Sequence, residues 1–248
     1  MTRALLLSAI LLLGLGCPKR PEVPRPGTSR EALEVGLDLL EQEDWKRAEE
    51  ALTYVIFNFP GSRQASDAQY FLAESYFRRG DYVSARTEYD FYLKSFPNGR
   101  YQEDAYYKLA MSYFESAPSG SRDNSNINQA RELLKDFLLL YPDSETRPRV
   151  EQALDRIAQR LAGQDFATAR LYFKAQEYRS ALVYYLHVAE TLEPERWEPV
   201  EQLRLAVCHL ETGDKEPARE LLAPLDDPGM PENIRQQAAE YLARLDSP

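Results

Sequence analysis

The sequence predicts an all-α solenoid of about five helix–turn–helix units, stacked in chain order and closed by a C-terminal capping helix. Three observations lead to this fold class. An apolar pattern with helical spacing recurs five times, small residues return at two fixed places in each copy, and a proline follows the second helix in each of the first four copies. Such a period is typical of repeat proteins, in which each unit buries its apolar face against its neighbours.

The five units are expected at about 29–62, 66–99, 103–144, 162–195 and 199–228. In the clearest copy, the helices AQYFLAESYFRRG and DYVSARTEYDFYLKSFP are joined by Gly80-Asp81 and stopped by Pro97. The small residues predict where the two antiparallel helices of a unit cross closely. They are Gly36, Ala73, Ala110, Ala169 and Ala206 in the first helices, and Ala48, Ala85, Ala130, Ala181 and Ala218 in the second helices. A unit of this kind, about 34 residues long, is the tetratricopeptide pattern.

Large apolar residues follow each second-helix alanine after four and after seven positions, which places them on one helix face. We expect this face to pack against the next unit. The residues at the first position are Leu52, Tyr89, Leu134, Tyr185 and Leu222, and those at the second are Val55, Tyr92, Phe137, Val188 and Leu225.

Three segments depart from the simple repeat. Unit three carries a polar insertion, SAPSGSRDNSNIN, between a first helix ending near Phe114 and a second helix starting near Gln129. A further helix is predicted at about 147–161, with the option that it continues without a break into unit four. The segment 231–245 carries one apolar stripe, and we interpret it as the capping helix.

The N-terminus has the pattern of a lipoprotein signal peptide at 1–16. Arg3 precedes a twelve-residue apolar run, which is too short to span a membrane, and the run leads to Gly16-Cys17. We expect the Cys17 thiol to carry a diacylglycerol and palmitate anchor. Gly14 and Leu15 depart from the usual lipobox, so a plain secretory signal or an uncleaved anchor is the alternative. The proline-rich segment 17–28 predicts an extended tether before a repeat domain at 29–248.

Composition and motifs argue against several function classes. A net charge of −10 makes nucleic acid an unlikely ligand. The two histidines, His187 and His209, have no second histidine at metal-ligand spacing, and no phosphate-binding loop or catalytic motif is visible. We therefore expect no catalytic residue, no metal and no cofactor. Cys208 and His209 are expected to be an inert buried thiol and a core residue.

Half of the aromatic residues of the chain lie between Tyr70 and Phe114. Helical phase places one set of side chains on the inner face of the solenoid, where a ligand would bind. The candidate partner-binding residues are Tyr70, Phe77 and Arg78 in unit two and Tyr107, Met111 and Phe114 in unit three. We interpret them as a surface for an extended client segment with an aromatic end, with Arg78 near its terminal carboxylate. The alternative is that these rings are repeat core.

Two segments carry a family resemblance: FNFPGSRQASDAQYFLAESYFRRGDYVSARTEYDFYLKSFP and ARLYFKAQEYRSALVYYLHVAETLEP. Together with the signal, the cysteine and the insertion in unit three, they resemble the BamD family of outer-membrane assembly lipoproteins. The resemblance implies an outer-membrane protein that faces the periplasm. It also implies docking of the C-terminal repeats onto a BamA-type barrel protein, contacts with other subunits of the assembly complex, and binding of unfolded outer-membrane protein peptides by the N-terminal repeats.

The same repeat vocabulary occurs in other periplasmic proteins, so two alternatives stay open. One is a lipoprotein adaptor for Tol and cell-wall coordination or for pilus assembly. The other is a cargo-binding chaperone without a fixed complex.

Overall fold

The computed structural model describes residues 22–118 and 123–246, so the expected signal peptide and Cys17 lie outside the described residues. The regular secondary structure of the described residues is entirely helical, which confirms the predicted fold class. The α-helices are α1 (Ser29–Glu41), α2 (Trp45–Asn58), α3 (Arg63–Arg78), α4 (Tyr82–Ser95), α5 (Gln102–Ser116), α6 (Ser125–Leu140), α7 (Arg147–Lys174), α8 (Tyr178–Ala189), α9 (Pro199–Thr212), α10 (Lys215–Leu222) and α11 (Glu232–Asp246), with short 3-10 helices at Pro194–Arg196 and Ala223–Asp226.

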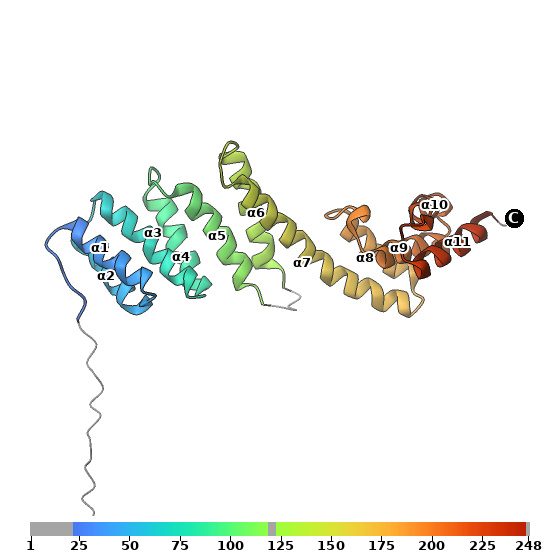
Figure 1. Cartoon of the computed structure of the whole chain (residues 1–248), viewed down its shortest axis with the longest axis horizontal. Coiled ribbons are helices and arrows are strands. Elements are labelled where there is room, and N and C mark those ends of the chain that lie inside the picture. The colour runs from blue at the N-terminus through green and yellow to red at the C-terminus, as the bar shows by residue number, and fades with distance from the viewer. Residues whose placement is uncertain (1–21, 119–122, 247–248) are drawn as a thin grey trace, which may run out of the picture.

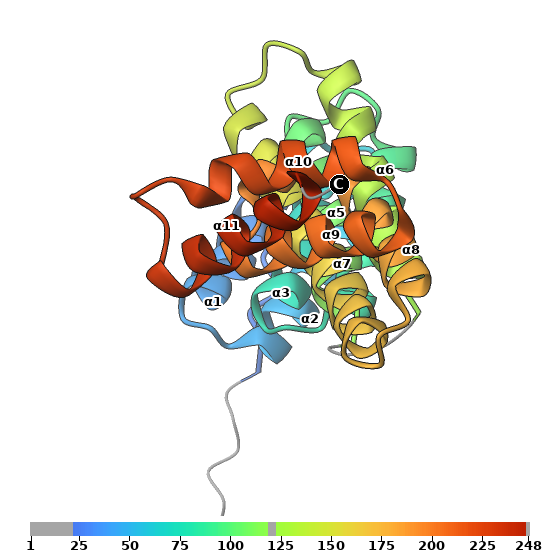
Figure 2. The same cartoon turned by 90° about the vertical axis from the view of Figure 1, so that its right-hand side faces the viewer.

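The molecule is elongated, and its helices follow one another along the long axis in chain order (Figure 1). Helices α1–α6 form one stack and α8–α11 form the other, with α7 running between them. Figure 2 looks along this axis, with α9–α11 at the near end. The five units correspond to α1/α2, α3/α4, α5/α6, the second half of α7 with α8, and α9/α10.

The small residues lie where the helices of a unit cross, as predicted. All nine alanines at these positions have an exposed fraction of 0%. At the remaining position, a Cβ added to Gly36 would lie 2.7 Å from Leu52 Cδ2, so even alanine would displace the α2 side chain. The ten large apolar residues that follow the second-helix alanines are also fully buried, at 0% each, and Leu225 among them lies in the 3-10 helix after α10. Both residue sets therefore form the core between units.

Four of the units share one turn between their helices. In unit two, Gly80 N–H donates to Phe77 O and Asp81 N–H donates to Tyr76 O, which is a Schellman turn with Gly80 at φ +83°. Gly213 has φ +98° at the same place in unit five. Units one and four instead place Glu43 (φ 57°) and Gln176 (φ 61°) there. The turn geometry is thus kept even where the residue is not glycine.

Helix α7 belongs to two cores. In its first half, Val150, Ala153 and Ile157 pack with α5 and α6. In its second half, Ala162 and Ala169 pack with α8 and α9. The predicted extra helix therefore does continue into unit four, as a single helix of 28 residues.

The capping helix is confirmed as α11. Ile234, Ala238 and Leu245 are buried against α9 and α10. The second helix of unit three starts at Ser125 and not near Gln129, because Ile127 is 1% exposed and anchors an additional turn in the core.

The described end of the predicted tether is packed against unit one. Val23 is 7% exposed and lies in a cluster with Leu39 and Leu40. The Tyr54 hydroxyl donates to Pro26 O at 3.2 Å, and Thr28 accepts from Glu31 N–H as the N-cap of α1. The predicted spacer is therefore shorter than 17–28, because residues from Val23 onward are part of the folded domain.

Candidate functional site

The six candidate partner-binding residues lie on α3 and α5, but they do not form one open stripe. Arg78 is exposed, and Phe77 and Tyr107 are half-buried. Tyr70, Met111 and Phe114 are buried, with exposed fractions of 7%, 4% and 5%. The prediction that these last three residues line an open binding surface is wrong. They belong to the repeat core, which was the alternative interpretation.

Tyr70 is covered by the start of unit three. Its ring stacks on Tyr101, with centroids 4.1 Å apart and planes 13° apart. Its hydroxyl donates to Asp104 Oδ2 at 2.5 Å. Burial and the neighbouring Asp104 carboxylate raise the pKa of Tyr70 well above its usual value. Helical phase assigned the correct helix face, but the residues before α5 close over it.

Met111 and Phe114 are covered by α7. Both belong to the core that includes Val150 and Ile157 of that helix. Above the Phe114 ring, the Arg156 guanidinium carbon lies 5.0 Å from the centroid. The first half of α7 has no counterpart in a regular repeat, so repeat positions alone could not reveal this cover.

The less buried part of the face consists of Phe77, Arg78 and Tyr107, of which Phe77 and Tyr107 also pack against the core. Lys108 Nζ lies 4.4 Å from the centroid of Phe77, and the Arg149 guanidinium carbon lies 4.6 Å from the centroid of Tyr107. Lys108 also pairs with Glu74 at 3.0 Å. The exposed Arg78 leans over Trp45, 5.4 Å from its ring. Aromatic rings with cations beside them thus form a surface with both apolar and positively charged contacts.

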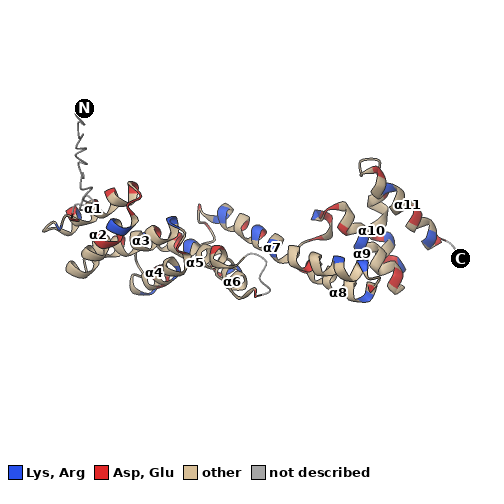
Figure 3. Ribbon diagram, turned by 90° about the horizontal axis from the view of Figure 1, so that it is seen from below, with Lys and Arg blue, Asp and Glu red and all other residues tan. Residues whose placement is uncertain are grey.

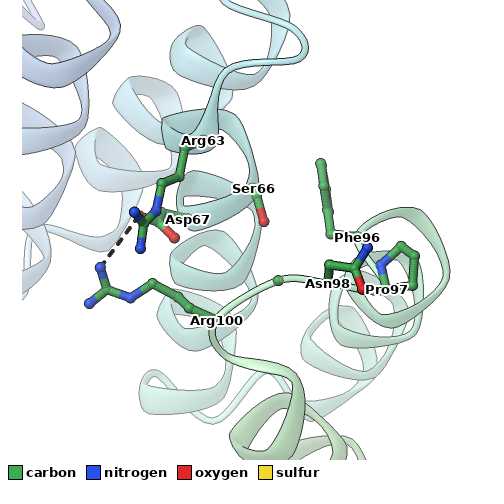
Figure 4. A pocket seen from close by; sticks show the side chains of 8 residues that line it. Arg63, Ser66, Asp67, Phe96, Pro97, Asn98 and Arg100 are labelled. Atoms are coloured by element: carbon green, nitrogen blue, oxygen red, sulfur yellow. Dashed lines mark ion pairs between the residues drawn. The ribbon is translucent and has the colours of Figure 1, made fainter.

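A pocket of about 410 Å³ lies at the start of α3, one helical turn before Tyr70. Figure 4 shows Arg63 and Asp67 from α3 on one side, and Phe96 and Pro97 on the other. Arg100 Nη1 lies 3.8 Å from Asp67 Oδ2. Asp67 is 7% exposed, and burial raises its pKa while the two arginines oppose the shift. With two guanidinium groups and one carboxylate beside an apolar wall, the pocket suits a carboxylate attached to an apolar side chain.

The sequence reasoning did not identify this pocket, although its residues surround the "FP" stop that marks the end of unit two. It also did not identify several large apolar side chains on the outer surface. The most exposed of these are Phe57, Val83, Leu139, Leu140, Leu171 and Val183.

The histidines and the cysteine of the described part of the chain belong to no metal-ligand cluster. No group of three or more His, Cys, Asp and Glu residues there is arranged to hold a metal ion. Cys208 is fully buried, and burial raises the pKa of its thiol to about 12. The His209 side chain is 12% exposed, as expected for a core residue, and His187 is open to solvent beside Asp165.

Figure 3 shows basic and acidic positions interspersed along the ribbon. Within residues 22–118 and 123–246, no helix has both the length and the apolar content needed to cross a bilayer.

Comparison with known proteins identifies one matching family and several solved structures with a similar fold. The model of the YfiO family, described as outer membrane lipoprotein, matches residues 26–196. The TPR2AB-domain:pHSP90 complex of yeast Sti1 has a TM-score of 0.50 at 10% identity, over 88% of this chain and 80% of that one. A thermophilic TPR protein of Thermus thermophilus has a TM-score of 0.38 at 17% identity, over 87% of this chain and 100% of that one. No curated protein matches the chain in sequence.

Proposed function

The chain belongs to the YfiO family of outer membrane lipoproteins, and from that premise we propose that it is a non-catalytic scaffold of the outer-membrane β-barrel assembly machinery. Its tetratricopeptide fold is suited to binding proteins, because a solenoid offers extended surfaces and no enclosed catalytic site. In this proposal the protein faces the periplasm, binds a BamA-type barrel protein and receives unfolded barrel clients.

Anchoring would depend on the lipidated Cys17. Val23 is packed on unit one, and five residues lie between it and Cys17, which gives a reach of about 20 Å at most. The substitution Cys17→Ser should abolish acylation and release the protein from the membrane. Processing of the variant with unchanged membrane fractionation would instead mean that a protein partner holds it there.

Client binding would use the partly exposed aromatic surface of units two and three. The observation that carries this proposal is the juxtaposition of Phe77 and Tyr107 with cationic groups, and the pocket that holds Arg63 and Arg100 lies at the opposite end of α3 from Phe77. The fitting ligand is an extended segment that ends in an aromatic residue and a free carboxylate, as in the C-terminal strand of an unfolded barrel protein. The rings would contact its apolar side chains, and Arg78 or the pocket arginines would pair with its carboxylate.

Peptide titration tests this assignment. Phe77→Ala or Tyr107→Ala should weaken binding of such a peptide by about 1–2 kcal/mol with little change in thermal stability. Tyr70→Ala is the contrasting variant, because Tyr70 is core and its loss should lower stability by about 3–5 kcal/mol. Amidation of the peptide terminus separates the contribution of the carboxylate. Unchanged affinity in the Phe77 and Tyr107 variants would reject the surface.

Affinity purification from solubilised outer membrane tests the assembly role itself. Recovery of a POTRA-containing barrel protein is the expected result. Recovery of Tol or pilus components in its place would reject this role in favour of another envelope adaptor.

A further inference from the structure

Each first helix of the solenoid has a face that receives the second helix of the preceding unit. The residue two positions after the small residue lies on this face. In units two, three and five it is Ser75, Ser112 and Cys208, with exposed fractions of 1%, 0% and 0%. The stacking face is therefore closed in these three units.

The next position on this face contacts the covering helix directly. In unit two, the Tyr76 hydroxyl donates to Glu49 Oε1 of α2 at 2.6 Å. In unit three, Arg86 of α4 lies over Tyr113, 4.8 Å from its centroid. The covering helix thus supplies apolar contacts together with a charged group for the tyrosine.

In unit four the corresponding face is open. Leu171 is 71% exposed and Tyr172 is 38% exposed, and the Tyr172 ring stacks only on Tyr184 of its own unit, at 5.6 Å. The cause is the length of α7, since α6 packs on its first half and the helix then continues beyond it (Figure 1). Near the boundary, Asn124 Nδ2 donates to Gln164 Oε1 at 3.0 Å. Leu171 lies almost two helical turns further on.

Unit one shows how the chain treats an end that stays open. Its position equivalent to Leu171 is Asp38, a polar residue that is exposed. Its next residue, Leu39, is 5% exposed because Val23 packs on it. Unit four has Leu171 at the position where unit one has a polar residue, and no segment among the described residues covers it. An apolar face left open in this way is typical of a protein–protein interface.

The charged residues around this face indicate which charge the bound segment should carry. In the stretch from Arg160 to Lys174, the exposed Lys174 lies three positions after Leu171 on the same side of α7, and Asp165 lies seven positions before Tyr172, on the Tyr172 stripe. Asp165, the one acidic residue in this stretch, lies 3.0 Å from His187 Nδ1 on α8. Arg160 donates to Ala117 O and Arg170 pairs with Glu201 Oε1 at 2.8 Å, so these two cations are engaged within the fold. The exposed Lys174 beside Leu171 favours an occupant that carries carboxylates.

We propose that the Leu171–Tyr172 face binds an acidic amphipathic helix of a partner protein, which takes the place of the missing second helix. Its apolar residues would cover Leu171, and one of its carboxylates would accept from the Tyr172 hydroxyl as Glu49 accepts from Tyr76. This inference deepens the proposed scaffold function and rests on it, since it names the kind of segment that docks on unit four.

The probe is a fluorescein-labelled peptide that copies residues 45–58 of α2, the helix that closes this face in unit two, with Lys46→Glu and Arg47→Glu. Its anisotropy is titrated with the mature chain carrying Cys17→Ser. We expect saturable binding and a gain of peptide helicity. A second peptide with Leu52→Ser and Val55→Ser should not bind.

Variants of the protein locate the binding site. Leu171→Arg should weaken binding by about tenfold or more, because a buried leucine contact is lost. Lys174→Glu should weaken it by a smaller factor. The matched control is Leu139→Arg on α6, because Leu139 is 80% exposed but lies outside the stacking face. The affinity of this variant for the peptide should stay within about twofold of that of the unsubstituted chain. Thermal melts of each variant confirm folding.

Three results would overturn the proposal. The first is that the peptide with Leu52 and Val55 intact does not bind. The second is that Leu171→Arg binds this peptide as tightly as the unsubstituted chain does, which would place the peptide elsewhere. The third is a concentration-dependent dimer in sedimentation that Leu171→Arg abolishes, since a second copy of the chain would then be the occupant. None of these depends on which protein is recovered from membranes, so failure here is distinct from failure of the assembly role.

Discussion

Glu201 ties three helices together and allows a quantitative test of the C-terminal stack. It lies on α9 with an exposed fraction of 2%, and its Oε2 accepts from the Tyr185 hydroxyl of α8 at 2.9 Å. Its Oε1 accepts from Arg170 Nε of α7 at 2.8 Å and from Arg204 Nη1 at 2.5 Å. Glu201→Ala should therefore loosen α7, α8 and α9 from one another.

The expected cost follows from what each partner loses. Tyr185 is fully buried, so a hydroxyl left without its acceptor costs about 1–3 kcal/mol. The side chains of Arg170 and Arg204 are 52% and 31% exposed, so water replaces much of what they lose and each adds about 1 kcal/mol or less. The sum for Glu201→Ala is about 1–5 kcal/mol. Tyr185→Phe keeps both arginine pairs and should cost about 1 kcal/mol.

Hydrogen exchange resolved by residue is the appropriate assay, because a solenoid couples mainly neighbouring units and need not unfold in one step. Protection should fall in α7–α9 and stay unchanged in α1–α4. A stability loss below about 1 kcal/mol in Glu201→Ala would refute the assignment of Glu201 as the charge that holds these helices. A uniform loss of protection along the chain would refute the repeat-by-repeat reasoning.

Three further predictions concern single positions. Gln176→Gly should raise stability by about 0.5–1 kcal/mol in denaturant titration, because Gln176 holds φ 61° where glycine has no steric penalty, and a loss would contradict the shared turn geometry. Cys208 in the Cys17→Ser chain should resist thiol reagents at pH 8 until denaturant is added, since its pKa is raised to about 12 by burial, and fast modification of the folded chain would show that the thiol is accessible. Ala85→Leu should cost about 1–3 kcal/mol by overpacking the crossing of α3 and α4, with exchange protection lost mainly in those helices; a neutral result would mean that the helices have room to separate.

Several features of the site could be predicted only in part from the sequence. Helical phase gave the face of α3 and α5 on which Phe77, Arg78 and Tyr107 lie. It could not show that Tyr101 stacks on Tyr70, because that contact joins two units through a turn. It could not place the arginines of α7 over Phe114 either, because no repeat equivalent exists for that half of the helix.

The same limit applies to polar partners. Tyr89 and Tyr185 occupy equivalent repeat positions, and each donates its hydroxyl to a glutamate. The acceptor is Glu74 of the same unit in one case and Glu201 of the next unit in the other. Side chains as long as glutamate reach such a hydroxyl from more than one backbone position, so repeat equivalence does not determine which residue supplies the acceptor.

The sequence by itself determined the repeat architecture, the crossing points and the core. Close helix crossings tolerate only small side chains and the stacked units need large ones, so these requirements are visible as a fixed period in residue size. Only the tertiary structure decided which faces remain open. Exposure of Leu171 or burial of Tyr70 depends on whether another helix or turn lies over that face, and that depends on where α7 directs the chain. A local pattern records the face that a residue is on, but the neighbour that covers the face is a property of the whole fold.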